Sequence, residues 1–411
     1  MKGNSRLRQI LAPGLIIMLG LAFAAGAQTY PNSTFQPHSE LGRYIDFLWN
    51  RLLLLGTIVF VLVEGALVYV IIRYRRTGTE TEKPPQTHGH ALLEIAWTMI
   101  PAFILLFIAV PTVRIVFKTQ AKVAAGALQI EVIGHQWWWE FRYPEYKITT
   151  ANEIYLPVGR TVNFKLNSND VIHSFWAPQL GGKRDVIANR TNYIWYTPDS
   201  TMKSAVWNGF CTEYCGTSHA KMRFRVFTVQ PAEFASWVAG QQRPAQYGST
   251  VASLPGGPSN GAVLASLPAG YTFPRNLAEF DYAKPHTPVP ADMHFTPGLT
   301  GHAAQGLTTF SSSACIGCHT IAGNPSALGT TGPNLTHIGS RSTLGAGSFP
   351  NTPAYLALWI KNARKMKPGI IMPTLGLNEM DPVQKRIIDK ASGGLDDQQI
   401  ADIVAYLSSL K

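Results

Sequence analysis

Two long apolar stretches constrain the fold of this chain more than any other feature. They run from about Leu48 to Ile72 and from about Leu93 to Val116. As helices, both are long enough to cross the hydrocarbon core of a bilayer, which is roughly 30 Å thick. They predict a membrane hairpin whose connecting loop carries four basic residues: Arg73, Arg75, Arg76 and Lys83. Because basic loops tend to stay in the cytoplasm, we expect the rest of the chain on the outer face.

An earlier apolar run, from Ile10 to Phe23, is typical of a secretory signal. Basic residues precede it, and Ala25-Gly26-Ala27 offers a small-residue cleavage site. A retained membrane anchor is the alternative, but the run is short for a span and ends in small residues. We therefore expect residues 1–27 to be a signal peptide and residues 28–117 to form the membrane hairpin.

The formal net charge of +11 raises the question of a nucleic-acid partner. Much of the basic excess lies ahead of the signal's apolar run and in the loop between the two spans, where membrane topology accounts for it. The sequence also contains no nucleic-acid-binding motif. The composition, 46% hydrophobic and 14% charged residues, instead favours a membrane protein in contact with lipid.

A cluster of metal-ligand residues occupies one short segment after the spans. Residues 211–222 carry Cys211, Cys215, His219 and Met222, and His173 lies upstream. Thiolate, imidazole and thioether groups suit copper, and two cysteines can bridge two copper ions that share one delocalised charge. The Cys-x-x-x-Cys spacing alone would also fit a small disulfide loop, but a disulfide leaves the histidine and methionine spacing without a role.

A second redox motif follows near the carboxyl end, in the run Cys315-Ile316-Gly317-Cys318-His319. Two thiols at this spacing can add to the vinyl groups of a haem, and the adjacent histidine can take an axial iron position. A zinc site or a redox dithiol would use the same spacing, but no further cysteine pair is left to complete a zinc set. Met372, in a loop with glycine and prolines, is the expected second axial ligand in preference to Met366.

Between and after these motifs the pattern indicates two folded units. Alternating apolar residues from Leu128 to Gln230 predict short strands of a β-sandwich or barrel, with the copper ligands on loops at one end. A stretch rich in Pro, Gly, Ala and Ser follows, and we interpret residues 242–297 as a flexible linker. Residues 298–411 are expected to form a helical domain that ends in a helix from Leu395 to Leu410.

The motifs resemble two known families. Residues 211–222 with His173 resemble the dinuclear copper (CuA) motif of cytochrome c oxidase subunit II. The 315–319 motif and Gly332-Pro333-Asn334-Leu335 resemble class I cytochromes c. The combination, over nearly all of the mature length, is similar to subunit II of caa-type oxidases. The resemblance implies a multidomain membrane protein: a two-helix transmembrane hairpin, an all-β cupredoxin domain over residues 118–241 and an all-α class I cytochrome c domain over residues 298–411.

The resemblance also implies ligands for each cofactor. The copper ligands would be the backbone carbonyl of Glu213 and five side chains: His173, Cys211, Cys215, His219 and Met222. The Glu213 carboxylate would bind magnesium at an interface with another subunit. Haem c would be held covalently by Cys315 and Cys318, with His319 and Met372 as axial ligands.

Two further residues take roles only through the resemblance. In the run Gln136-Trp137-Trp138-Trp139, Trp137 corresponds to the residue through which electrons enter subunit II; packing or a membrane-interface position would also account for these tryptophans. Glu94, at the cytoplasmic start of the second span, matches a glutamate at the mouth of a proton-uptake path in the partner subunit. An interface carboxylate with no such role is the alternative.

The implied function is electron input to a terminal haem-copper oxidase in the bacterial inner membrane, with the redox domains on the periplasmic face. Electrons would pass from a cytochrome c or a quinol-oxidising complex to haem c, to CuA and to the haem of subunit I, where dioxygen is reduced to water and protons are translocated. All eleven histidines of the chain lie outside the two spans, so the dioxygen-reducing site belongs to a separate subunit. Subunits I and III are the expected partners.

Two other functions fit the motifs less completely. A nitric oxide reductase with a CuA subunit would share them, and differs in the acceptor of its partner subunit. A copper-delivery or redox-sensing membrane protein would need labile copper and no haem.

If the chain is an oxidase subunit, the linker gives the haem domain a high effective concentration at the copper domain. Docking of the haem domain on the copper domain would then not need a strong surface charge patch.

Overall fold

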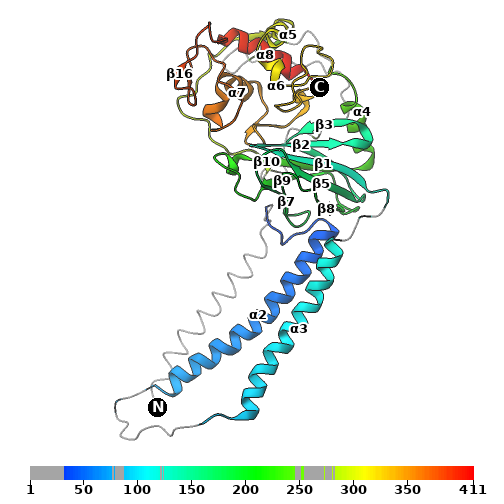
Figure 1. Ribbon diagram of the computed structural model, residues 1–411, viewed down its shortest axis with the longest axis vertical. Helices are drawn as coiled ribbons and strands as arrows, with labels where there is room; N and C mark the ends of the chain where they lie inside the picture. The colour runs from blue at the N-terminus through cyan, green and yellow to red at the C-terminus, as the bar shows by residue number, and fades with distance from the viewer. Residues whose placement is uncertain are drawn as a thin grey trace.

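The computed structural model describes residues 32–75, 78, 88–120, 123, 125–245, 251–253, 273, 280 and 283–411. The predicted signal peptide, Arg76, Lys83 and most of the predicted linker lie outside these residues. The described chain forms three parts stacked along one direction: a pair of long helices, a β-sandwich and a helical unit that contains the carboxyl terminus (Figure 1). The predicted fold class is confirmed in all three parts.

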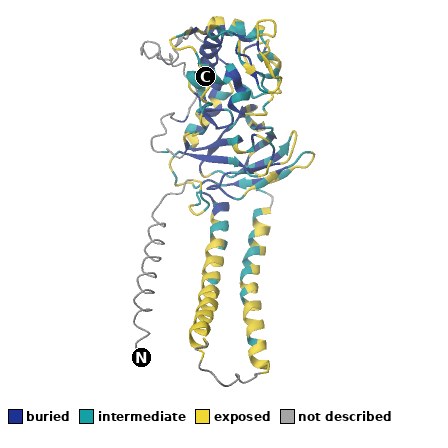
Figure 2. Ribbon diagram, turned by 90° about the vertical axis from the view of Figure 1, so that its left-hand side faces the viewer, coloured by how far each residue is buried: buried dark blue, intermediate teal, exposed yellow. Residues whose placement is uncertain are grey.

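The membrane hairpin consists of α2 (Glu40–Arg73) and α3 (Ala91–Gln120), which run side by side (Figure 1). Both are long and apolar enough to cross a membrane. Their side chains are almost entirely exposed, as the yellow colour of both helices in Figure 2 shows. Exposure of so many Leu, Ile, Val and Phe side chains fits contact with lipid or with another membrane subunit. Both predicted spans lie within these helices.

The β-sandwich consists of two five-stranded sheets. One has the order β3-β2-β1-β5-β8, formed by β1 (Leu128–His135), β2 (Trp138–Tyr143), β3 (Ile148–Ala151), β5 (Val162–Ser168) and β8 (Asn192–Tyr196). The other has the order β4-β10-β9-β6-β7, formed by β4 (Glu153–Pro157), β6 (His173–Trp176), β7 (Arg184–Val186), β9 (Ala205–Cys211) and β10 (Arg223–Val229).

Aromatic rings fill the space between the two sheets. The ring of Phe175 stacks on that of Phe224 with centroids 4.6 Å apart, and the fully buried Trp139 meets both rings edge-on. Alternation along each strand directs such residues inward, which is why the pattern predicted a two-layer fold. A short helix after the last strand, α4 (Pro231–Gln241), packs its Trp237 on Tyr155 of β4.

The helical unit contains α5 (Ala303–Ser312), α6 (Cys315–Cys318), α7 (Pro353–Met366) and α8 (Asp397–Ser409). Three small two-stranded ladders complete it: β11 (Val251–Ser253) with β12 (Thr300–His302), β13 (Thr343–Leu344) with β14 (Phe349–Pro350), and β15 (Met380–Asp381) with β16 (Arg386–Ile387). The predicted terminal helix is present as α8, and β11 lies in the segment that the sequence predicted as linker.

The helical unit packs directly against the β-sandwich, on the side away from the hairpin (Figure 1). Glu153 of β4 is 3% exposed because Ser342 and Thr343 of the helical unit cover it. Ala283, from the end of the predicted linker, is buried and accepts a hydrogen bond from Arg225 Nε at 3.0 Å. Described residues of the predicted linker therefore pack on the folded units: Phe273 and Ala283 join the core of the sandwich, and Met293 joins that of the helical unit.

Candidate metal and haem centres

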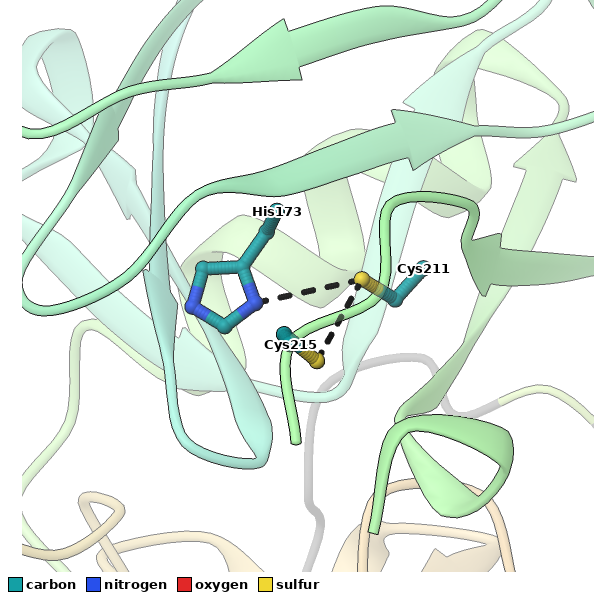
Figure 3. Close-up of side chains that lie close together, drawn as sticks. All are labelled: His173, Cys211 and Cys215. Atoms are coloured by element: carbon teal, nitrogen blue, oxygen red, sulfur yellow. Dashed lines mark hydrogen bonds between the residues drawn. The ribbon is translucent and has the colours of Figure 1, made fainter. Parts of the chain in front are cut away.

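The six predicted copper ligands converge at one end of the sandwich. His173 begins β6, Cys211 ends β9, and the other four lie on the loop that leads into β10. The sulfur atoms of Cys211 and Cys215 are 3.8 Å apart, and Nδ1 of His173 is 3.8 Å from the Cys211 sulfur. Figure 3 shows these three side chains pointing toward one another.

The remaining ligand atoms surround the same two sulfurs. Nδ1 of His219 is 3.6 Å and the thioether of Met222 is 3.8 Å from the Cys215 sulfur. The carbonyl oxygen of Glu213 is 3.3 Å from the Cys211 sulfur. Both cysteines are free thiols and buried. The cluster thus offers two thiols, two imidazoles, one thioether and one carbonyl, and His173, Cys211, Cys215 and Met222 are buried. Soft sulfur and imidazole ligands suit copper.

The surroundings of Cys211 favour the thiolate form of its side chain. The hydrogen bond between the two cysteine sulfurs lowers the pKa of Cys211 to about 4, and it raises that of Cys215. The His173 imidazole and backbone amides also stabilise the Cys211 thiolate. A thiolate is the form of cysteine that binds metal, so the lowered pKa of Cys211 favours metal binding at this sulfur.

Asp170 orients His173 and was not singled out from the sequence. The Nε2–H of His173 donates to its Oδ1 at 2.8 Å, which leaves Nδ1 facing the cysteines. Burial opposes ionisation of Asp170, but hydrogen bonds from His173 and from the amides of Gln136 and Val171 lower its pKa. Such a carboxylate partner fixes the tautomer of a metal-binding histidine. Its position three residues ahead of His173 is the signal that could have revealed it.

The haem-binding motif lines a cavity at the contact between the two domains. Cys315, Cys318, His319 and Met372 all border it, whereas Met366 is buried elsewhere in the helical core. The Nδ1–H of His319 donates to the Pro333 carbonyl at 2.8 Å, which leaves Nε2 available for iron. Burial lowers the pKa of His319, so the ring is neutral, as an axial ligand must be.

The cavity also fits the acidic part of a haem. The side chain of Arg341 lines it and is buried, and its Nε has no hydrogen-bond partner within the described residues. A buried guanidinium with an unused donor is suited to a carboxylate, and haem carries two propionates. The cavity residues therefore fit a covalently attached haem. Arg341 was not predicted, because nothing around it in the sequence resembles a motif.

Trp137 lies between the two centres. Its indole N–H donates to the Cys215 carbonyl at 2.8 Å, and its side chain lines the haem cavity. Trp137 is only 7% exposed, because the helical unit covers it. Trp138 stacks on His135 with centroids 4.1 Å apart, and Trp139 points into the core.

The other two predicted site residues are exposed. The Glu213 side chain faces solvent next to the copper cluster, so its carboxylate can reach a group on another chain. Glu94 lies in the first turn of α3, at the end of the hairpin away from both redox sites (Figure 1). The structure thus brings the copper and haem residues together around Trp137 and leaves Glu94 apart from them.

Comparisons with known proteins agree with this architecture. Residues 31–115 match the family model for the cytochrome c oxidase subunit II transmembrane domain, residues 147–229 that for its periplasmic domain, and residues 303–411 that for cytochrome c. A cytochrome c oxidase subunit 2 from Alkalihalophilus pseudofirmus is 31% identical over 359 residues, covering 86% of this chain and 83% of the relative.

Two more relatives carry the same description. Cytochrome c oxidase subunit 2 from Bacillus subtilis is 30% identical, covering 84% of this chain and 82% of the relative. The crystal structure of the periplasmic domain of subunit II of cytochrome oxidase from Bradyrhizobium japonicum is 31% identical, with a TM-score of 0.28, and covers 29% of this chain and 97% of that one. On the evidence of the family models and of the full-length relatives, the protein belongs to the cytochrome c oxidase subunit II family, as a membrane-anchored subunit of an oxidoreductase complex with an additional cytochrome c domain.

Proposed function

We propose that this chain receives electrons at a covalently bound haem c and passes them through a dinuclear copper centre to the haem of subunit I. The haem and the copper pair supply the one-electron redox chemistry when bound. The residues described above would hold them: Cys315, Cys318, His319 and Met372 for haem, and His173, Cys211, Glu213, Cys215, His219 and Met222 for copper.

One observation carries this proposal: Trp137 contacts both sites. Its indole N–H is bonded to the main chain of a copper-ligand residue, and its ring borders the cavity that carries the haem-binding motif. A path through this side chain would avoid any gap filled by water. We infer that electrons enter the copper domain through Trp137, and that here they come from the fused haem domain.

The same proposal includes the wider assembly. Subunit I, and with it subunit III, would cover the exposed hairpin, and the Glu213 carboxylate would complete a magnesium site at that interface. Glu94 would stand at the mouth of a proton-uptake path in subunit I. The complex would lie in the bacterial inner membrane with both redox domains on the periplasmic side, and it would reduce dioxygen to water while translocating protons.

Electron paramagnetic resonance of the purified complex tests the copper assignment. A mixed-valence copper pair gives multiline hyperfine structure, and we expect this signal in the wild-type protein. Replacing one bridging sulfur, in Cys211→Ser, should abolish the multiline pattern, because one thiolate cannot hold two copper ions in the same way. Tyr214→Phe, on the exposed part of the same loop, is the matched control and should keep it.

A spectrum of a single cupric ion in the wild type, or Cys211 and Cys215 joined in a disulfide in the metal-loaded complex, would rule the copper assignment out. A separate measurement identifies the final electron acceptor of the complex. We expect the same preparation to consume dioxygen and not nitric oxide.

A further inference from the structure

Lys367 is a charged side chain in an unusual position. It caps the carboxyl end of α7 and is 2% exposed, although lysine is among the residues least often buried. Burial, together with the nearby positive charge of Lys221, lowers its pKa to about 7. Burying a charged group costs free energy unless hydrogen bonds compensate, so the contacts of Lys367 matter.

The ammonium group of Lys367 joins the two domains. Its Nζ donates to the Trp137 carbonyl at 2.6 Å and to the Gly345 carbonyl at 3.0 Å. Trp137 belongs to the β1–β2 turn of the sandwich, and Gly345 belongs to the β13–β14 turn of the haem domain. One side chain therefore fixes the main chain of the tryptophan that lies between the two redox sites.

The backbone of Lys367 leads directly to the predicted haem ligand. Met372 follows five residues later, and Gly369 lies between them, with a positive φ of 90°. A Cβ at Gly369 would come within 2.7 Å of the Trp137 ring, so only glycine permits this approach. The loop that carries Met372 thus contacts the indole ring of Trp137, and Lys367 holds the main-chain carbonyl of the same residue.

Other contacts hold the domains together around this point. Lys221 Nζ donates to the Met366 carbonyl at 2.9 Å, and Ser218 Oγ donates to the Pro368 carbonyl at 2.5 Å. Glu153 Oε1 accepts hydrogen bonds from the amides and hydroxyls of Ser342 and Thr343 at 2.6–2.9 Å. None of these bonds involves the Lys367 side chain, so its loss should disturb the position of Trp137 without separating the domains.

We propose that Lys367 is a positioning residue for electron transfer from the haem to the copper centre, holding Trp137 against the methionine-bearing loop. This inference rests on the proposed function. Electron tunnelling weakens exponentially as the gap between donor and acceptor widens, and a small displacement in a preorganised site has a large effect on rate. Lys367 would therefore influence the rate of this step while ligating neither metal.

The test uses the complete oxidase complex with the Lys367→Met variant, which keeps most of the side-chain volume and removes the ammonium donors. A photoreductant reduces haem c rapidly, and the haem and copper absorbances follow the internal transfer. We expect the rate of transfer to fall by about tenfold or more. The midpoint potentials, the haem spectrum and the copper resonance should stay as in the wild type. Lys365→Met, two residues earlier and paired with Asp292 at 2.6 Å, is the matched control and should transfer at the normal rate.

Each other outcome counts against the proposal. An unchanged rate in Lys367→Met shows that the ammonium does not set the geometry of transfer. A slow rate accompanied by altered potentials or spectra, or by an equally slow Lys365→Met control, shows a general structural role instead. Absence of any transfer from haem c to copper in the wild type would contradict the proposed function itself, and is therefore distinguishable from failure of the Lys367 assignment.

Discussion

At the scale of single residues, Asp381 shows how one buried carboxylate organises a loop of the haem domain. It is 1% exposed, accepts hydrogen bonds from the amides of Val383 and Gln384 at 2.8 Å, and pairs with Arg364 at 2.8 Å. Burial alone would raise its pKa, but these partners outweigh it and lower the pKa to about 2. The ionised form is therefore the one that the fold stabilises.

The effect of pH on stability follows from that shift. Because the folded pKa of Asp381 is below its ordinary value of 3.8, its contribution is complete above about pH 4 and is lost as pH falls toward 2. Asp381→Asn should lower the thermal midpoint of the haem domain at pH 7, and the difference from the wild type should shrink below pH 4. Asp389→Asn, an exposed position nearby, should cost less at pH 7. A difference for Asp381→Asn that stays constant from pH 7 to pH 2 would contradict this account.

At the residue level, the sequence indicated proximity within a motif but not contacts between distant residues. The structure brings together the cysteine, histidine and methionine side chains that the motifs indicated, and most of them lie within two short segments, residues 211–222 and 315–319. Glu153 and Ser342, in contrast, are 189 residues apart and belong to no motif. From the sequence, we expect that docking of the two domains does not need a strong surface charge patch. The observed contact relies instead on a few buried charges, which residue counts cannot reveal.

At the scale of elements, the crossing of α5 and α8 defines the core of the haem domain. Gly306 of α5 lies against the main chain of α8, where an added Cβ would be 1.9 Å from the Asp402 carbonyl oxygen. Phe310, one turn later, packs edge-on against Tyr406 of α8. The helices approach so closely because the residue at the contact has no side chain.

Gly306→Ala should therefore force the two helices apart. Overpacking of this kind costs about 1–3 kcal/mol, and more where backbone is the obstacle. Denaturant unfolding of the haem-loaded chain, followed at the haem absorbance, should show a lower midpoint. Gln305→Ala, at the exposed neighbouring position, should leave the free energy of unfolding within about 0.5 kcal/mol of the wild-type value. Equal stability of the wild type and Gly306→Ala would show that the helices can separate at little cost.

Elements with strong periodicity were the ones that the sequence predicted well. The two spans, the strands of the sandwich and the terminal helix α8 all have a clear apolar pattern. The sequence around β11 has none, and its composition therefore indicated a linker. Within the described residues, β11 pairs with β12 of the haem domain, a contact between distant residues that no local pattern reveals.

At the scale of the whole molecule, the hairpin separates the start of α3 from the redox domains (Figure 1). Under the proposed function, Glu94→Gln removes a proton-accepting carboxylate at that distant end and leaves the electron path untouched. Proton translocation and turnover of the complex should fall, while transfer from haem c to copper proceeds at the wild-type rate. Glu64→Gln, a second carboxylate of the hairpin, serves as the comparison. If Glu94→Gln turns over and pumps normally, Glu94 has no part in proton uptake.

The covered position of Trp137 has a kinetic consequence for the assembled enzyme. A diffusing carrier cannot reach this side chain while the haem domain lies over it. Under the proposed function, the carrier therefore reduces haem c in a bimolecular step, and the transfer from haem c to copper is a second, internal step. The rate of the first step should scale with the concentration of the external reductant. The second step joins two sites of one polypeptide, and its rate constant is first order: diluting the enzyme leaves it unchanged.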